Sequence, residues 1–179
     1  MNPHVERLTR LVAPPDVPPL RKDWDGVISE LGTGLPGDYV DLIDAYGGGR
    51  FDGYLWFLEP GCANRHYDLE RSISERNEAF QILWEMGEPK PEQLELPGSQ
   101  VIPWASTDNG EFLYWLVRPG VDPDEWTVMV NEARGERWEQ FEVGCSELLV
   151  RLLAGEIHSE ILSSSFPSRV HEFRSSASF

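Results

Sequence analysis

The sequence has little positive charge. It contains 15 Lys and Arg residues against 31 Asp and Glu residues, so its formal net charge is −16 at pH 7. Direct binding to a nucleic-acid backbone or to an anionic membrane requires a positive surface, and we therefore expect neither partner. A strongly negative protein is suited instead to fast encounter with a basic protein. Acidic surfaces are also common on soluble bacterial proteins, so charge alone does not decide between these interpretations.

Cysteines are few, and no long apolar segment is present. Cys62 and Cys145 are far apart, which permits one disulfide but provides neither a disulfide framework nor a CxxC metal motif. No apolar run approaches the length of a membrane span, and the first residues contain no signal-peptide core. These absences predict a cytoplasmic protein with reduced thiols.

Motifs of common enzyme families are absent as well, including GxSxG, HExxH, GxGxxG and the P-loop. The run Gly47–Arg50 follows a predicted helix instead of preceding one, so no helix N-terminus would face a phosphate there. His66 beside Asp68 could form a general base with an orienting carboxylate, and Cys62 could pair with His66. No nucleophile adjoins them, and two ligands do not make a structural zinc site. We expect no enzyme, cofactor or metal, and keep a small hydrolase as an alternative.

The clearest pattern lies between Leu35 and Leu58. A helix is predicted over 35–47, because its apolar residues follow the i, i+3, i+4, i+7 spacing of one buried face. These residues are Tyr39, Leu42, Ile43 and Tyr46. Three glycines then end the helix, and the dense apolar run from Tyr54 to Leu58 predicts a buried strand.

This stretch resembles the signature of the SUKH superfamily, the Smi/Knr-like proteins. The residues that carry the resemblance are Leu35-Pro36-x-Asp38-Tyr39, Leu42, Ile43 and Tyr46-Gly47-Gly48-Gly49. The strand Ile102-Pro103-Trp104 and the turn after it fit the same pattern, so the resemblance extends from near Trp24 to Gly155. Many bacterial members are immunity proteins that neutralise a partner toxin. The resemblance therefore implies a protein-binding module, or alternatively a regulatory scaffold of the same superfamily.

Other segments have helical or strand patterns. Further helices are predicted at His4–Val12, at Trp24–Leu31 after a cap at Asp23, at Asp68–Met86, and from a cap at Ser146 to Gly155. Two hairpins are predicted from strands at 101–105, 111–117, 126–131 and 136–143. Four prolines between Ala13 and Leu20 predict an extended connector.

The predicted fold is α+β in a single domain, with an antiparallel-rich sheet of about five to six strands covered by helices on one face. Residues 1–22 are expected to form a helix and a Pro-rich connector, and residues 23–162 the SUKH-like domain. Residues 163–179 are expected to form a Ser-rich flexible tail. The insertion 62–99 matches no family motif.

Acidic residues are concentrated between Val121 and Glu147. We predict partner contacts at five of them: Asp122, Asp124, Glu125, Glu136 and Glu139. Acids around an aromatic anchor suit a basic partner, because charge accelerates encounter and aromatic burial adds affinity. Trp126 and Trp138 lie nearby, but we expect both to face the core. The predicted partner is a basic toxin domain, such as a nuclease, and the sequence does not indicate the oligomeric state.

Overall fold

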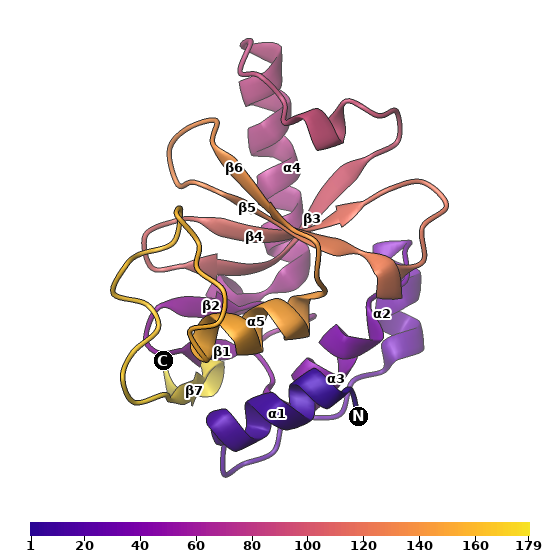
Figure 1. The fold of residues 1–179 in the computed structure, drawn as a ribbon. Helices are drawn as coiled ribbons and strands as arrows, with labels where there is room; N and C mark the ends of the chain where they lie inside the picture. Colours follow the sequence, from indigo (N-terminus) through magenta and orange to yellow (C-terminus); the bar gives the residue numbers. More distant parts are fainter.

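The fold is built on one antiparallel sheet of seven strands in the order β6-β5-β4-β3-β2-β1-β7 (Figure 1). The computed structural model describes residues 1–179. The strands are β1 (Gly49–Phe51), β2 (Leu55–Phe57), β3 (Gln100–Thr107), β4 (Phe112–Val117), β5 (Thr127–Asn131), β6 (Trp138–Phe141) and β7 (Phe173–Ser175). The predicted single α+β domain is confirmed, with two strands, β1 and β7, that the sequence patterns did not indicate.

Strands β1 to β6 form a meander in which chain neighbours are also sheet neighbours. The predicted hairpins are both present, because β4 pairs with β3 and β5 pairs with β6. Gly110 in the β3–β4 turn has φ +95°, a conformation that glycine adopts without a Cβ penalty. The long connection between β2 and β3 contains helix α4.

Five α-helices accompany the sheet: α1 (Pro3–Leu11), α2 (Trp24–Leu31), α3 (Gly37–Tyr46), α4 (Leu69–Glu85) and α5 (Cys145–Leu153). Asp23 caps α2 by accepting a hydrogen bond from the Gly26 N–H at 3.2 Å, as predicted. The predicted cap at Ser146 is wrong, since Gly144 occupies that position and Ser146 lies in the first turn. No helix combines the length and the apolar composition that crossing a membrane requires.

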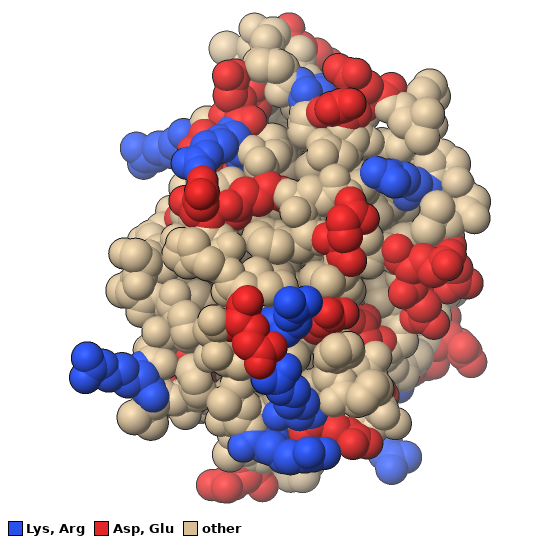
Figure 2. All heavy atoms as spheres, in the orientation of Figure 1, with Lys and Arg blue, Asp and Glu red and all other residues tan.

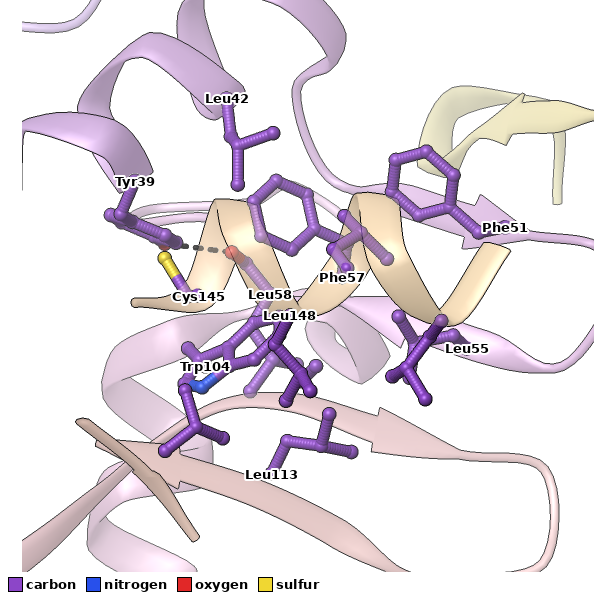
Figure 3. Packing of buried hydrophobic residues seen from close by; sticks show 14 of the residues in the cluster. Tyr39, Leu42, Phe51, Leu55, Phe57, Leu58, Trp104, Leu113, Cys145 and Leu148 are labelled. Carbon is purple, nitrogen blue, oxygen red and sulfur yellow. Dashed lines mark hydrogen bonds between the residues drawn. The ribbon is translucent and has the colours of Figure 1, made fainter. Parts of the chain in front are cut away.

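Helices α1, α3 and α5 cover the first face of the sheet (Figure 1). The predicted buried residues of α3 are at most 1% exposed, and they pack against aromatic residues of the sheet. The Tyr39 ring meets Phe57 and Trp115 edge-on, with ring centroids 5.6 Å and 4.8 Å away. Its hydroxyl donates to the Leu58 carbonyl at 2.7 Å (Figure 3). Tyr39 therefore joins α3 to the sheet through both apolar and polar contacts.

The second face is covered as well, which corrects the expectation of a single covered face. Alternate strand residues point to opposite faces, so Tyr114 and Met129 lie opposite the main core. There they pack with Phe80 of α4, which also stacks on Trp84 at 4.9 Å. The alternation of β4 and β5 thus supplies a smaller second core under α4.

The remainder of the second face, at strands β1, β2 and β7, is covered by stacked aromatic and guanidinium groups. Arg50 lies over the rings of Trp56 and Phe179, at 4.4 Å and 4.5 Å from their centroids. Trp56 also stacks on Tyr67 at 5.3 Å. This end of the sheet is therefore covered by side chains of the sheet itself, by Tyr67 of the short 3-10 helix η1 (Arg65–Tyr67) and by Phe179, and not by an α-helix.

The expected flexible tail forms part of the sheet in the structure. Strand β7 pairs with β1, and Phe173 packs against Tyr46 and Phe51 with ring centroids 5.0 Å and 4.7 Å away. A Cβ atom at Gly49 would meet the Arg174 carbonyl oxygen at 2.4 Å. The Phe173 ring and the close approach that Gly49 permits thus allow this Ser-rich segment to add a strand to the sheet.

Candidate protein-binding surface

The five predicted contact acids fall into two separate groups. Asp122, Asp124 and Glu125 belong to the short 3-10 helix η3 (Pro123–Glu125) and its cap, immediately before β5. Glu136 and Glu139 lie at the far end of β5, in the β5–β6 turn and in β6. Five strand residues span about 17 Å, so one small contact patch cannot include all five acids.

The acids at η3 are all exposed, but they differ in their hydrogen bonds. Asp122 accepts from the Asp124 N–H at 3.0 Å and so caps η3. Asp124 accepts from the Gly37 N–H at 2.6 Å, which caps α3 from another part of the chain. Glu125 forms no hydrogen bond or ion pair through its side chain, which leaves its charge free for a partner.

The acids at the β5–β6 hairpin also differ. Glu136 is exposed, whereas Glu139 is half-buried. The Glu139 carboxylate accepts from the Ser159 hydroxyl at 2.5 Å and from the Glu160 N–H at 2.7 Å. Glu139 therefore holds the segment after α5 against β6, and it is less available to a partner than the other four acids.

Both nearby tryptophans pack towards the core, as expected, but Trp126 is buried whereas Trp138 is half-buried. Trp126 is 4% exposed, and its indole N–H donates to the Val121 carbonyl at 3.3 Å. Trp138 packs on the second face against Phe80 and Tyr114, with ring centroids 5.6 Å and 5.4 Å away. The Trp126 ring is therefore not available to anchor a partner, and contacts at η3 depend on the acids.

Carboxylates of α3 cap the starts of two other helices. Asp38 accepts from the Ser146 N–H at 2.9 Å in the first turn of α5, which has no side-chain cap of its own. Asp41 accepts from the Asn2 N–H at 2.5 Å, at the start of α1. The first turn of a helix has unpaired N–H groups and a partial positive charge. Each of these carboxylates therefore accepts a hydrogen bond from an N–H group and also interacts favourably with the positive end of the helix dipole. Together with Asp124, three carboxylates connect the starts of α1, α3 and α5.

These helix starts surround an open hollow of about 650 Å³, which we call the acidic hollow. Its lining includes four carboxylates and neither lysine nor arginine; the acids are Asp38, Asp41, Asp124 and Glu147. Acidic side chains are visible where α1, α3 and α5 begin (Figure 2). Of these acids only Asp124 was predicted as a contact. The sequence signal was the acidic residue in the first turn of α3 and of α5, but the sequence does not show that the two turns meet.

Comparison with known protein families shows which family this chain belongs to. The family described as SMI1 / KNR4 family (SUKH-1) matches residues 18–144, which is more than half of the chain. The chain belongs to the SUKH-1 family. This is a family of immunity-type proteins, and the resemblance noted in the sequence is confirmed. No curated protein and no solved structure matches the chain.

The matched region of this SUKH-1 protein includes all five predicted contact acids and most of the sheet. Helix α5 and strand β7 follow it, and α1 precedes it. The acidic hollow therefore combines residues inside the matched region, such as Asp41 and Asp124, with residues outside it, such as Glu147.

The residues considered for a hydrolase, Cys62, His66 and Asp68, do not form a catalytic group in this SUKH-1 protein but make separate contacts. Asp68 caps α4 by accepting from the Arg71 N–H at 3.0 Å, and His66 is exposed. The Cys62 thiol donates to the Ser176 hydroxyl at 3.4 Å, and burial raises its pKa, which disfavours the thiolate. No hydrogen bond joins these three side chains, and no group of three or more His, Cys, Asp or Glu residues is arranged to hold a metal.

Proposed function

We propose that this SUKH-1 protein is a cytoplasmic immunity protein that binds and neutralises a basic toxin domain without catalysing a reaction. The observation that carries the proposal is the family match over residues 18–144. The net charge of −16 supports a basic partner, because long-range attraction raises the rate of encounter between oppositely charged proteins.

The exposed acids at η3 are the proposed steering surface. Asp122 and Glu125 have no basic side chain within ion-pair distance, and neither does Asp124. Two of these carboxylates cap backbone N–H groups, but none of the three is neutralised by a basic side chain, so their negative charges are available to attract an approaching partner. A nuclease presents a positive groove to its substrate phosphates, and an acidic surface of this kind can occupy that groove.

Identification of the partner is the first test. The tagged protein is purified from its native cells under mild conditions, and the proteins retained with it are identified by mass spectrometry. A basic toxin domain whose activity is inhibited by stoichiometric addition of the purified protein would support the proposal. Retention of a host signalling protein, with no toxin, would contradict it and favour the regulatory scaffold.

The steering surface is tested by changing Asp122→Asn, Asp124→Asn and Glu125→Gln together and measuring association with the toxin by stopped flow. The amides keep the side-chain shape, and the amide that replaces the Asp124 carboxylate retains an oxygen to accept from the Gly37 N–H. The association rate should fall, and its dependence on ionic strength should become flatter, because exposed charges are screened beyond about 8 Å at physiological salt.

A matched control removes three charges elsewhere. Glu78, Glu92 and Glu95 are exposed residues of the 62–99 insertion, so their change to Gln alters the net charge equally. This control should slow association less than the η3 variant does. An equal or larger effect of the control would move the steering surface to the insertion.

A further inference from the structure

Two arginines lie side by side on the second face of the sheet, at the strand pair β1–β7. Arg50 of β1 and Arg174 of β7 are direct cross-strand partners. Both guanidinium groups also stack on the Phe179 ring, at 4.5 Å and 4.9 Å from its centroid. Like charges directly opposite each other on neighbouring strands repel and destabilise a sheet. The fold therefore holds two positive charges together at this end of the sheet.

The acids nearby do not neutralise this pair. The one carboxylate within ion-pair distance of Arg50 is that of Asp108, at 3.9 Å, and its side chain is 56% exposed. Arg174 forms no ion pair, neither with the exposed Glu172 two residues before it nor with the α-carboxylate of Phe179. A single carboxylate at the limit of ion-pair distance therefore faces two guanidinium groups.

The Arg50 side chain is fixed in place with unused hydrogen-bond donors. Its guanidinium stacks on the rings of Trp56 and Phe179, at 4.4 Å and 4.5 Å from their centroids, and its Nε donates to the Tyr67 hydroxyl at 3.3 Å. Its Nη1 and Nη2 form no hydrogen bond within the protein and are open to solvent, since the side chain is 21% exposed. A ligand that binds these donors would not have to order the side chain first.

Charge and geometry select the class of ligand. Arg174 is exposed, so both guanidinium groups can be reached from solvent. Guanidinium groups bind carboxylate or phosphate oxygens through pairs of N–H donors. A carboxylate balances one positive charge, whereas a phosphate monoester carries about 1.5 to 2 negative charges at pH 7 and balances nearly both. The net charge of −16 repels a polyanion such as a nucleic acid, which favours an isolated phosphate group.

We propose that Arg50 and Arg174 bind the phosphate group of a phosphate monoester, which bridges β1 and β7. The proposal goes beyond the proposed function and does not depend on it. A bound phosphate removes the repulsion between the two guanidinium groups and so stabilises the attachment of the last strand. Arg50 lies inside the region that the family matches and Arg174 lies outside it, so the site forms only where both segments pack together.

The test uses two probes that carry a phosphate monoester, N-acetyl-O-phosphoserine amide and glycerol phosphate. Each is titrated into the ¹⁵N-labelled full-length protein in about 0.15 M salt, which screens the net charge beyond about 8 Å. We expect saturable shifts of the backbone amides of Arg50, Phe51, Arg174 and Ser175, which pair between the two strands or border them. The melting temperature should rise with probe concentration, because the folded state alone has the site.

Control ligands define what the site recognises. N-acetyl-serine amide, which lacks the phosphate, should cause no saturable shifts, and acetate at equal ionic strength should bind at least about tenfold more weakly than either phosphate probe. Tighter binding of the phosphoserine probe would assign a phosphorylated side chain as the source of the phosphate. Tighter binding of glycerol phosphate would assign a free small molecule.

Variants separate the arginine pair from other arginines. Arg174→Gln removes one charge from an exposed side chain and should weaken binding of both probes at least about tenfold. Arg50→Lys keeps the charge but loses the planar fork, and it should weaken binding severalfold. Arg118→Gln removes an exposed charge just after β4 and should leave binding unchanged.

Three results would overturn the assignment: equal binding of acetate, shifts spread over all arginines without saturation, or full binding by Arg174→Gln. If Arg50→Lys fails to fold, Arg174→Gln still decides, because the Arg174 side chain is exposed and its removal leaves the core intact. No toxin is present in any of these measurements, so failure of the phosphate site leaves the proposed function standing.

Discussion

The two faces of the sheet differ in how deeply they are buried. The first face contributes to a cluster of 30 buried residues with α1, α3 and α5, whereas the second contributes to a cluster of six under α4. Helix α4 buries only Leu69 and Phe80, and its Ile82 and the Met86 that follows it are 57% and 81% exposed. Most of the favourable free energy of apolar burial therefore comes from the first face, and α4 adds a smaller amount by packing on the second face.

The more deeply buried first face gives the more rigid support for a binding site. The acidic hollow lies at the starts of the three helices of the first face, so its carboxylates are held by elements with fully buried side chains. Sites built on such rigid elements keep their geometry better than sites on loops. The following predictions test the contrast between the faces, beginning with the largest expected effect.

The same substitution should cost more on the first face than on the second. Leu42→Ala in α3 removes a side chain that is 0% exposed, and we expect a loss of about 2–5 kcal/mol in the free energy of unfolding. Leu83→Ala in α4 removes a half-buried side chain and should cost about 1 kcal/mol. Urea unfolding of both variants checks the difference. Equal losses would show that the second face is as important to stability as the first.

High pH should destabilise the packing of the second face, because the buried Tyr114 hydroxyl loses its proton. Burial raises the pKa of Tyr114 to about 12, and the hydrogen bond from Arg76 opposes that rise. The folded state therefore holds this proton more tightly than the unfolded state, whose tyrosine pKa is near 10. The stabilisation that protonated Tyr114 gives to the folded state is complete below about pH 10 and is lost as the pH rises through about 12. The free energy of unfolding should fall by up to about 3 kcal/mol over this range.

Thermal unfolding between about pH 9 and about pH 12 measures this loss. Burial also raises the pKa of Tyr39 and of Tyr46 on the first face, so the whole protein should lose stability in alkali. Tyr114→Phe should make the decline less steep, because one of the groups responsible is absent. A decline of unchanged slope would contradict the role of Tyr114.

The cap that Asp38 provides to α5 should contribute a smaller amount. Asp38→Ala removes the acceptor of the Ser146 N–H, and we expect a cost of about 1–2 kcal/mol. Asp38→Asn keeps an acceptor oxygen and should recover most of that loss. Denaturant unfolding of the pair measures both values. If the two variants are equally destabilised, the charge and not the hydrogen bond is the stabilising element.

The smallest effect is expected at the cysteines. Both are free, so no disulfide is lost on substitution. Cys62→Ser at the half-buried site should change stability by no more than about 0.5 kcal/mol, and Cys145→Ala should keep the fold while leaving a small cavity in the first face. Neither should alter partner affinity in reducing buffer. A large loss of affinity without unfolding would indicate a thiol or metal site.

Much of this architecture could be predicted from local sequence. The α3 face, the cap at Asp23 and the Asn109-Gly110 turn depend on residues a few positions apart, and periodicity and turn chemistry are sufficient to find them. The position of α4 on the second face could not be predicted. Its apolar spacing shows which side is buried, but not which face of the sheet that side meets.

The remaining differences involve contacts between distant residues. Strand β7 requires Phe173 to reach Tyr46 and Phe51, and its own sequence is short and rich in serine. The acidic hollow requires Asp41 to reach Asn2 and Asp38 to reach Ser146. In the sequence these acids are ordinary polar residues of one helix, and only the tertiary packing places them around a common space.

The order of strands in the sheet also has a kinetic consequence. Strands β1 to β6 pair with chain neighbours, whereas β7 pairs with β1 across more than a hundred residues. Pairings of high sequence separation form slowly, because a long loop must close before any contact is gained. During synthesis the meander can assemble while β1 is still an open edge. Until Phe173 has been made, Tyr46 and Phe51 lack one of the rings that pack against them, so β7 completes this end of the first-face core after the rest of the sheet can form.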